Sequence, residues 1–369
     1  MRYLSAVRTS TTMATFIRGA VKIPGLSRVR TSVRRIRDRF AVKAVVLLYH
    51  RVAALSSDPQ LLSVHPQRFK KQMEYLATHY HVWSLQRLLK AACEEHRLPE
   101  RIVAVTFDDG YVDNLLEAKP VLEAYQSPAT VFVSTAYLDR EREFWWDELE
   151  RVLLIPRSVP AHLRVTVGGK VMEWPLGECA AQVPHRHPEH TTWNVTSTIT
   201  PAPCYQVYRD MHRLLRPLGF EDREGILAKL RAQVGCDEKA RSGYRVMQEV
   251  EIRQLAASGL ISIGAHTVTH PVFSTQSLEV RRYELLESKR RLQAILGTCV
   301  KSFAYPFGGP SDIGDTPPEL IQEAGYEVAC STISSPLTVT SDRWRLPRYL
   351  VRNWDRDEFA DQLNGFFHG

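Results

Sequence analysis

The sequence has 369 residues, of which 44% are hydrophobic and 24% are charged, and its formal net charge is +7. This composition is ordinary for a soluble globular protein, and the length allows one large α/β domain with an elaboration, or two domains. The charge is uneven, because residues 1–40 carry ten Lys and Arg residues against the single acid Asp38. That balance of +9 leaves −2 for residues 41–369, so the basic character belongs to the N-terminal tail.

The basic tail, residues 1–40, has no apolar run near the roughly 20 residues of a membrane-spanning helix. It also lacks the apolar core and small-residue cleavage site of a secretory signal. We interpret it as a solvated arm, and the functional alternative is a basic amphipathic segment that rests on anionic lipid. No recognition module accompanies its arginines, so we expect no nucleic-acid partner.

The six cysteines lie far apart in the sequence and form no C-x-x-C pair. In a chain of this size they indicate free thiols in a reducing compartment, not a disulfide framework. We therefore expect a cytoplasmic protein, with peripheral contact to the inner membrane face as an option that depends on the tail.

Strand and helix patterns alternate along the chain after the tail. Near-continuous apolar runs predict strands that are covered on both faces, at 43–50, 102–107, 128–135, 260–267, 302–308, 326–332 and 343–351. Helical patterns lie between them, at 65–80, 115–125, 277–296 and 317–325. This alternation predicts a parallel sheet closed into a barrel, with the chemistry at the C-terminal strand ends.

The alternation breaks between Phe144 and Arg245, where we predict an inserted α+β subdomain at the barrel mouth. Residues 163–174 are typical of a hairpin, and residues 203–234 of a helical stretch. The predicted organisation is a tail at 1–40, a barrel in two parts at 41–143 and 246–369, and the insertion at 144–245. Trp145 and Trp146 fit a helix that anchors the insertion, with stacking on a sugar face as the alternative.

Two adjacent carboxylates, Asp108 and Asp109, end the buried strand at 102–107, and Gly110 lets the chain turn beyond them. Neighbouring side chains of a strand point to opposite faces, so the two aspartates have different tasks. His266 and His270 follow the strand at 260–267, four residues apart. Two such imidazoles and a carboxylate from a neighbouring strand can converge on one divalent ion.

The motifs "TFDDG", "HTVTH" and "FAYPFG", each after a predicted strand, resemble those of the polysaccharide deacetylase family, the NodB-homology domain of carbohydrate esterase family four. The segments "LLYHRV" and "FWWDELE" are also similar to longer bacterial members. The resemblance covers roughly 41–140 and 245–355 and leaves the tail and the insertion unexplained. It implies an α/β fold, a deformed (β/α) barrel of the polysaccharide deacetylase type with an inserted α+β subdomain.

The resemblance also implies roles for five residues. Asp109, His266 and His270 would hold a divalent metal, usually Zn²⁺, with Co²⁺ as a further option. Asp108 would be the general base, and the backbone N–H of Phe307 would stabilise the oxyanion together with the metal.

Two departures from the family pattern concern the remaining catalytic residues. Ala304 stands where many members have an arginine that pairs with the catalytic aspartate; Arg348 is our substitute, and an ordinary barrel-end arginine is the alternative. The family's late Leu-x-His has no match, since the only histidine after His270 is His368. His50 is our substitute for the acid or for a substrate contact, and a core histidine is the alternative.

The expected function is a metal-dependent hydrolase that removes acetyl groups from an N-acetylated saccharide, polysaccharide or lipid-linked glycan precursor. The alternatives are a hydrolase of another non-peptide C–N amide bond and a non-catalytic carbohydrate-binding relative. Intact metal ligands argue against the binding relative. A glycosidase needs two carboxylates roughly 5–9 Å apart across a sugar, and no second acidic candidate stands out.

Overall fold

The computed structural model of the protein describes residues 42–95, 98–140, 142–155, 159–177 and 192–368. These residues belong to one compact unit, Val42–Gly369. The basic tail at 1–40, with its expected lipid contact, lies outside the described residues. Within the described ranges, no helix combines the length and the apolar character that crossing a membrane requires.

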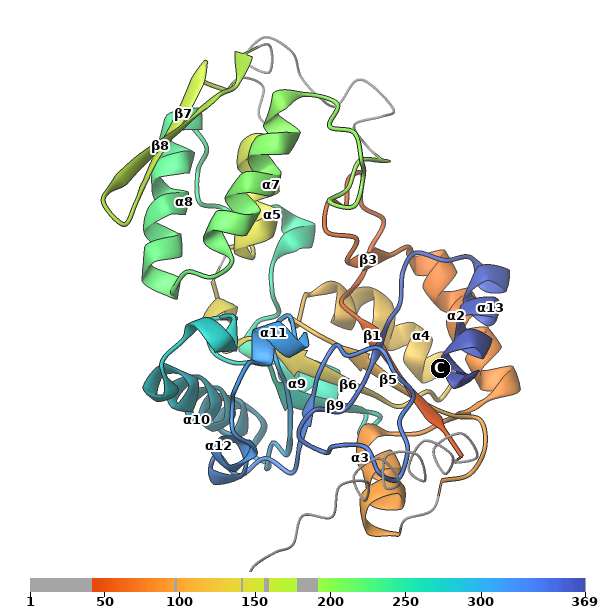
Figure 1. Ribbon diagram of the computed structural model, residues 1–369. Coiled ribbons are helices and arrows are strands. Elements are labelled where there is room, and N and C mark those ends of the chain that lie inside the picture. The colour runs from red at the N-terminus through yellow and green to blue at the C-terminus, as the bar shows by residue number, and fades with distance from the viewer. Residues whose placement is uncertain (1–41, 96–97, 141, 156–158, 178–191, 369) are drawn as a thin grey trace, which may run out of the picture. The chain divides into compact units, whose positions relative to one another are not determined.

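A curled parallel sheet forms the centre of the protein (Figure 1). Its strands are β1 (Ala44–Tyr49), β4 (His81–Val82), β5 (Ile102–Phe107), β6 (Ala129–Val133), β9 (Ile261–Ala265), β10 (Ser302–Ala304), β11 (Val328–Cys330) and β12 (Tyr349–Leu350). The order is β11-β10-β9-β6-β5-β1-β12, and β4 pairs with the start of β5. An isolated bridge between Cys330 and Leu346 links the two outer edges. The predicted deformed (β/α) barrel is confirmed.

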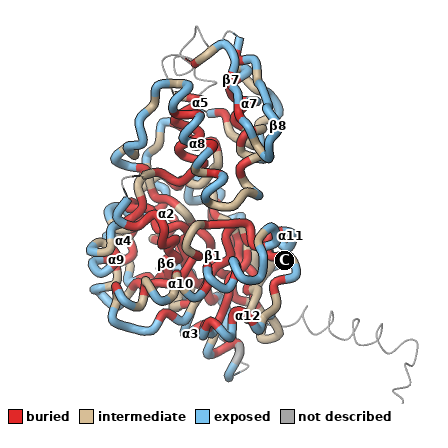
Figure 2. The backbone as a smooth tube through the Cα atoms, turned by 90° about the vertical axis from the view of Figure 1, so that its left-hand side faces the viewer, coloured by how far each residue is buried: buried red, intermediate tan, exposed pale blue. Residues whose placement is uncertain are grey.

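The strands are buried because helices cover the outside of the curled sheet. All six residues of β1 and of β5 are buried, as their apolar runs predict, and the tube in Figure 2 shows buried backbone at the centre. The surrounding helices are α2 (Pro66–His79), α3 (Leu85–Leu89), α4 (Lys119–Ala124), α9 (Glu249–Ala256), α10 (Leu278–Leu296), α11 (Pro310–Ile313), α12 (Pro318–Glu323) and α13 (Arg356–His368).

Short connecting elements complete the barrel: β2 (Arg51–Val52), β3 (Ser63–Val64), η1 (Lys90–Glu94), η2 (Asn114–Ala118), η3 (Thr135–Tyr137), η6 (Ser242–Tyr244) and η7 (Phe273–Thr275). Helix α2 shows how the sequence sets the helix boundaries. Pro66 stands at the first helical position, where its missing N–H costs nothing, and the His65 side chain accepts a hydrogen bond from the second position. Phe69, Met73 and Leu76 are buried on one face, as their spacing predicts.

The inserted segment contains a buried helix, a hairpin and two further helices. Its elements are α5 (Trp145–Leu153), β7 (His162–Val167), β8 (Lys170–Pro175), α7 (Pro203–Leu215) and α8 (Phe220–Val234). The predicted hairpin at 163–174 is present. The predicted helical stretch at 203–234 is instead two helices, because Pro217 and Gly219 interrupt it.

Helix α5 is buried along its whole length, and it holds the insertion together by charge pairs as well as by apolar packing. Glu148 accepts from Arg142 and Arg231, and Glu150 accepts from Arg241. Buried carboxylates of this kind need such partners, because an unpaired buried charge costs several kcal/mol.

Prolines also explain where the barrel elements are shorter than the sequence pattern predicts. The strand expected at 343–351 is divided into an isolated bridge at Leu346 and the short β12, with Pro347, which has no N–H to donate, between them. The strand expected at 302–308 ends at Ala304, two residues before Pro306. The helix expected at 115–125 is divided into the wide turn η2 and helix α4, with Pro120 near the junction.

Candidate metal and active site

The residues that the sequence singles out meet at the C-terminal ends of the strands. Asp108 and Asp109 follow β5, the two histidines of "HTVTH" follow β9, and Phe307 follows β10. A cavity of about 140 Å³ lies between them, and its lining residues are His50, Gln60, Leu62, Asp108, Asp109, Trp146, His212, His266, His270, Phe307 and Thr332. Arg348 lies outside this lining, behind Asp108, to which it is hydrogen-bonded.

The backbone at the site is in a conformation that side chains rarely adopt. Asp109, Thr267, His270 and Phe307 have φ angles of 75°, 68°, 55° and 60°, and they are four of the eight non-glycine residues with positive φ in the described part of the chain. Gly110, where we predicted a sharp turn, has a φ angle of 83°. Such conformations are costly and concentrate where function requires a particular side-chain direction.

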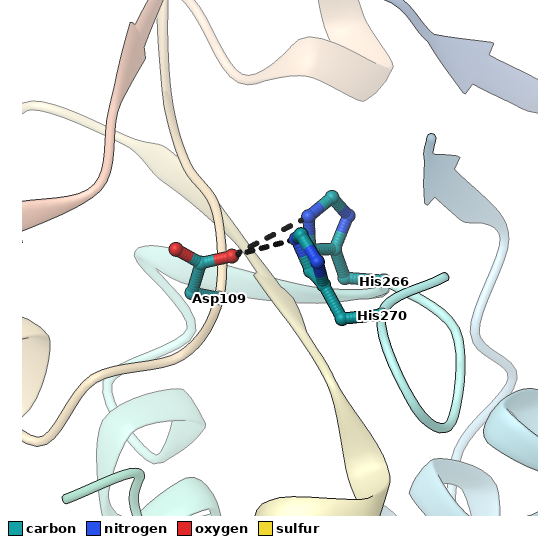
Figure 3. Close-up of side chains that lie close together, drawn as sticks. All are labelled: Asp109, His266 and His270. Carbon is teal, nitrogen blue, oxygen red and sulfur yellow. Dashed lines mark ion pairs between the residues drawn. The ribbon is translucent and has the colours of Figure 1, made fainter. Parts of the chain in front are cut away.

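Asp109, His266 and His270 form a compact set of three possible metal ligands (Figure 3). The Asp109 Oδ1 atom lies 3.5 Å from His266 Nε2 and 3.3 Å from His270 Nε2, and all three donor atoms lie within 4.8 Å of one another. All three residues are buried, and Asp109 Oδ1 makes no hydrogen bond of ordinary geometry. A buried carboxylate oxygen facing two imidazole nitrogens fits a divalent cation.

The two imidazoles are prepared for ligation in different ways. His266 Nδ1 lies 2.8 Å from the Ala304 carbonyl, which fixes the proton on Nδ1 and leaves the Nε2 lone pair toward Asp109. Burial lowers the pKa of His270 to about 4, so this ring is neutral at pH 7. Burial also lowers the pKa of His266, but the carboxylates Asp108 and Asp109 outweigh it and leave that pKa raised.

Asp109 remains ionised in this setting. Burial alone raises the pKa of its carboxyl, yet the adjacent rings of His266 and His270 hold that pKa well below its usual range. The set therefore offers one carboxylate and two imidazole nitrogens, which is a donor set that divalent transition metals bind.

Asp108 is held by Arg348 in a buried two-point ion pair. The Arg348 Nη1 and Nη2 atoms donate to Asp108 Oδ1 and Oδ2, both at 2.7 Å. Arg348 also donates from Nε to the Ser331 carbonyl at 2.8 Å and from Nη1 to Thr106 Oγ1 at 3.2 Å. Burial raises the pKa of Asp108, but Arg348 outweighs it, so the carboxyl has a lowered pKa and stays ionised.

Phe307 and His50, which the sequence analysis assigned to the site, both line the cavity. The Phe307 ring lies 4.9 Å from the His270 ring. His50 has a buried Nδ1 atom with no hydrogen-bond partner, and burial lowers its pKa, so the ring is neutral. Their chemical roles stay predictions, as do those of Asp108 and Arg348.

Four lining residues were not singled out for this site by sequence reasoning: Gln60, Leu62, His212 and Thr332. His212 belongs to the inserted helix α7, in a stretch with no recognisable motif, so no signal marked it. For Trp146 the sequence favours a helix that anchors the insertion, with stacking on a sugar as the alternative, and the side chain packs in the core with 4% of its surface exposed. It also reaches the site, with its ring 4.9 Å from the His270 ring.

Parts of the chain are similar to known polysaccharide deacetylases. A family model described as polysaccharide deacetylase matches residues 95–164 and 238–348, so it omits β8, α7 and α8. A stretch of 128 residues is 25% identical to the protein YxkH of Bacillus subtilis strain 168. A stretch of 114 residues is 30% identical to the poly-beta-1,6-N-acetyl-D-glucosamine N-deacetylase of Escherichia coli strain K12. These matches cover 34% and 28% of this chain but only 44% and 17% of those relatives.

Solved structures share the fold over nearly the whole chain. The deacetylase PplD of Streptococcus pyogenes, in complex with acetate, gives a TM-score of 0.54 at 16% identity and covers 88% of this chain and 99% of its own. IcaB from Ammonifex degensii gives a TM-score of 0.52 at 17% identity, with 89% and 98% covered. At these identities the likeness concerns the fold and not the activity.

Proposed function

We propose, from the premise that the chain belongs to the polysaccharide deacetylase family, that it is a metal-dependent hydrolase which removes acetyl groups from an N-acetylated saccharide. The observation that carries this proposal is the convergence of Asp109, His266 and His270 beside the ionised Asp108. One carboxylate with two imidazoles is a donor set of zinc enzymes, and Co²⁺ is the substitute that such sites accept. A bound ion would act as a Lewis acid and lower the pKa of water.

The base in this proposal is Asp108. Its Oδ2 atom lies 4.0 Å from His266 Nε2, so it stands next to the ligand set without belonging to it. Because the pKa of Asp108 is lowered, the carboxylate is ionised at pH 7 and can accept the proton of the attacking water. Arg348 fixes its orientation through both oxygens.

The remaining steps fall to groups around the cavity. The Phe307 N–H is the proposed donor to the oxyanion that forms when water adds to the acetyl carbonyl. The C–N bond then breaks, acetate leaves, and the departing amine takes up a proton. His50 is the proposed acid or substrate contact, since it reaches the cavity with an unpaired Nδ1 atom.

The substrate class rests on relatives. The E. coli relative is named for acting on poly-beta-1,6-N-acetyl-D-glucosamine, and a saccharide, a polysaccharide or a lipid-linked glycan with N-acetyl groups is the corresponding proposal here. A cytoplasmic location and contact of the basic tail with an anionic membrane are further proposals from sequence alone. Among enzymes, the alternative is hydrolysis of another C–N amide bond.

The test is metal analysis of the purified protein, followed by acetate release from oligomers of N-acetylglucosamine and from a non-sugar acetamide. We expect about one Zn²⁺ or Co²⁺ per chain and acetate from the sugar only. Acetate from the non-sugar amide alone would favour the alternative hydrolase. Metal binding without any hydrolysis would favour a carbohydrate-binding relative.

A further inference from the structure

One wall of the cavity is built by segments outside the matched family regions. Gln60 and Leu62 come from the loop before β3, and His212 comes from the inserted helix α7. Trp146 of α5, which lies inside the matched range 95–164, joins them. The metal-ligand set follows the barrel strands β5 and β9, whereas Trp146 and His212 belong to the inserted segment, so two separate parts of the chain line the same cavity.

Helix α7 is tied to the barrel on both sides of His212. Tyr208, His212 and Arg216 are spaced four apart and lie on one side of the helix. The Tyr208 hydroxyl accepts from Gln60 Nε2 at 2.7 Å, and Arg216 Nη2 donates to Asp312 Oδ1 at 2.6 Å. These two contacts fix where His212 stands relative to the ligand set.

The Arg216 guanidinium also lies 4.3 Å from the centre of the Phe307 ring. Its ion pair with Asp312 offsets part of its positive charge at this edge of the cavity. The two insertion residues that line the cavity, Trp146 and the neutral His212, share it with the charged Asp108 and Asp109.

His212 itself has the chemistry of a sugar contact. Its ring rests 4.8 Å from the Trp145 ring, and burial lowers its pKa to about 4. A neutral imidazole has one donor and one acceptor nitrogen, and a sugar hydroxyl can use either. Gln60, Leu62 and Trp146 beside it are also uncharged.

We propose that His212 is a substrate-binding residue that hydrogen-bonds a hydroxyl of the sugar ring whose acetamido group faces Asp108 and the metal ligands. The inference rests on the proposed deacetylase function and extends it. It assigns recognition of an uncharged N-acetylated sugar to the insertion, and hydrolysis to the barrel.

The test compares His212→Ala, His212→Gln and the control His162→Ala in the full chain loaded with Zn²⁺. His162 is a suitable control because it is exposed on the inserted hairpin, where it pairs with Glu173. Metal content, kcat and KM are measured with N-acetylglucosamine oligomers, and kcat/KM is measured with an aryl acetate that carries the acetyl group but no sugar.

We expect His212→Ala to lower kcat/KM for the oligomers about 10- to 100-fold, the effect of one lost hydrogen bond in a site that excludes water. In His212→Ala, kcat/KM for the aryl acetate should fall much less, and the metal content should be unchanged. His212→Gln should recover part of the lost kcat/KM for the oligomers. An equal fall in kcat/KM for both substrates, or no fall for the oligomers, would overturn the inference. If the wild-type protein released no acetate from any sugar, the proposed function itself would fail, and this inference with it.

Discussion

The Arg348 guanidinium donates to both oxygens of Asp108 at 2.7 Å, from the residue just before β12, which lies on the other side of β1 from β5. In many polysaccharide deacetylases, which the motifs of this chain resemble, an arginine of the third motif pairs with the catalytic aspartate, and here Ala304 occupies that position. Here the guanidinium comes from another place in the chain, the residue next to the start of β12. Arg348 is fully buried and bonded to Ser331 and Thr106 as well, so its position is fixed on every side.

Replacing Arg348 with lysine should lower turnover while metal content is kept. A lysine cannot make two parallel hydrogen bonds to a carboxylate, so Asp108 would lose its fixed orientation. Hydrogen bonds to charged groups contribute about 1.5–3 kcal/mol each, which corresponds to roughly a 10- to 100-fold fall in kcat. Acetate release and metal analysis of Arg348→Lys measure the two quantities.

Arg345→Lys is the matched control, because Arg345 donates to the Gly314 carbonyl and makes no contact with Asp108. It should retain activity. A second check adds Arg348→Lys to the Asp108→Asn variant. The second substitution should lower kcat little further, because the effects of substituting residues that act as one unit are not additive. Fully additive losses would assign Arg348 to barrel structure and not to the base.

Asp108→Asn alone should keep the metal and lose the base. The amide preserves the shape of the side chain but cannot take a proton from water. We expect kcat to fall about 10²- to 10⁴-fold, which is the usual contribution of general-base catalysis. Zinc content close to that of the wild type, measured in the same preparation, shows that the loss is chemical. Near-normal acetate release would require a different base.

Most strands of the barrel could be predicted from the sequence, because burial on both faces leaves a clear apolar pattern. Strands buried on both faces must be apolar throughout, so the runs at 43–50 and 102–107 are unambiguous, and the strands found there are β1 and β5. The strand ends were less predictable. Pro306 and Pro347 have no backbone N–H to donate, so β10 ends before Pro306 and the pairing of 343–351 is interrupted at Pro347, although the apolar pattern continues.

Most of the candidate site could also be predicted from the sequence, because its motifs are short and each follows a strand. The role of His212 in the cavity could not be predicted, because the sequence pattern of an amphipathic helix is the same whether its histidine faces solvent or a distant cavity. Its position depends on how α7 packs against the barrel, through contacts such as Arg216 with Asp312. Long-range packing of this kind leaves no local pattern.

Gly264→Ala should destabilise the barrel beneath the site. Gly264 lies on β9, two residues before His266, and a Cβ there would stand 2.4 Å from Phe132 Cδ1 and 2.8 Å from Ser302 Oγ. Such overpacking typically costs about 1–3 kcal/mol of unfolding free energy, which chemical denaturation measures. Gly225→Ala is the control, since nothing lies within 4 Å of a Cβ at that position of α8, and it should be neutral or stabilising.

Removing residues 1–41 should abolish binding to anionic lipid vesicles and leave acetate release unchanged. The +9 balance of residues 1–40 gives up to roughly 1 kcal/mol of attraction per basic residue near such a surface, and salt screens it. Co-sedimentation with anionic vesicles at low and high salt measures this, and zwitterionic vesicles serve as the control. Equal binding with and without the tail would exclude the proposed contact.

Metal affinity should fall as the pH falls, and one proton should account for most of the change. A protonated imidazole has no lone pair, so a proton on His266 Nε2 competes directly with the ion. The pKa of His266 is raised above its usual 6.5, whereas that of His270 is lowered to about 4. Between pH 5 and the pKa of His266, therefore, His270 is already neutral, and binding must displace the proton of His266.

The expected slope in this window is about a tenfold gain in Zn²⁺ affinity per pH unit, with a plateau above the pKa of His266. Competition with a chromophoric chelator, in buffers that bind zinc weakly, measures the affinity at each pH. His266→Ala should bind no stoichiometric metal at any pH, while the exposed His162→Ala should follow the wild-type curve. Full occupancy in His266→Ala would remove this histidine from the ligand set, and an affinity independent of pH from 5 to 8 would mean that His266 carries no proton to displace.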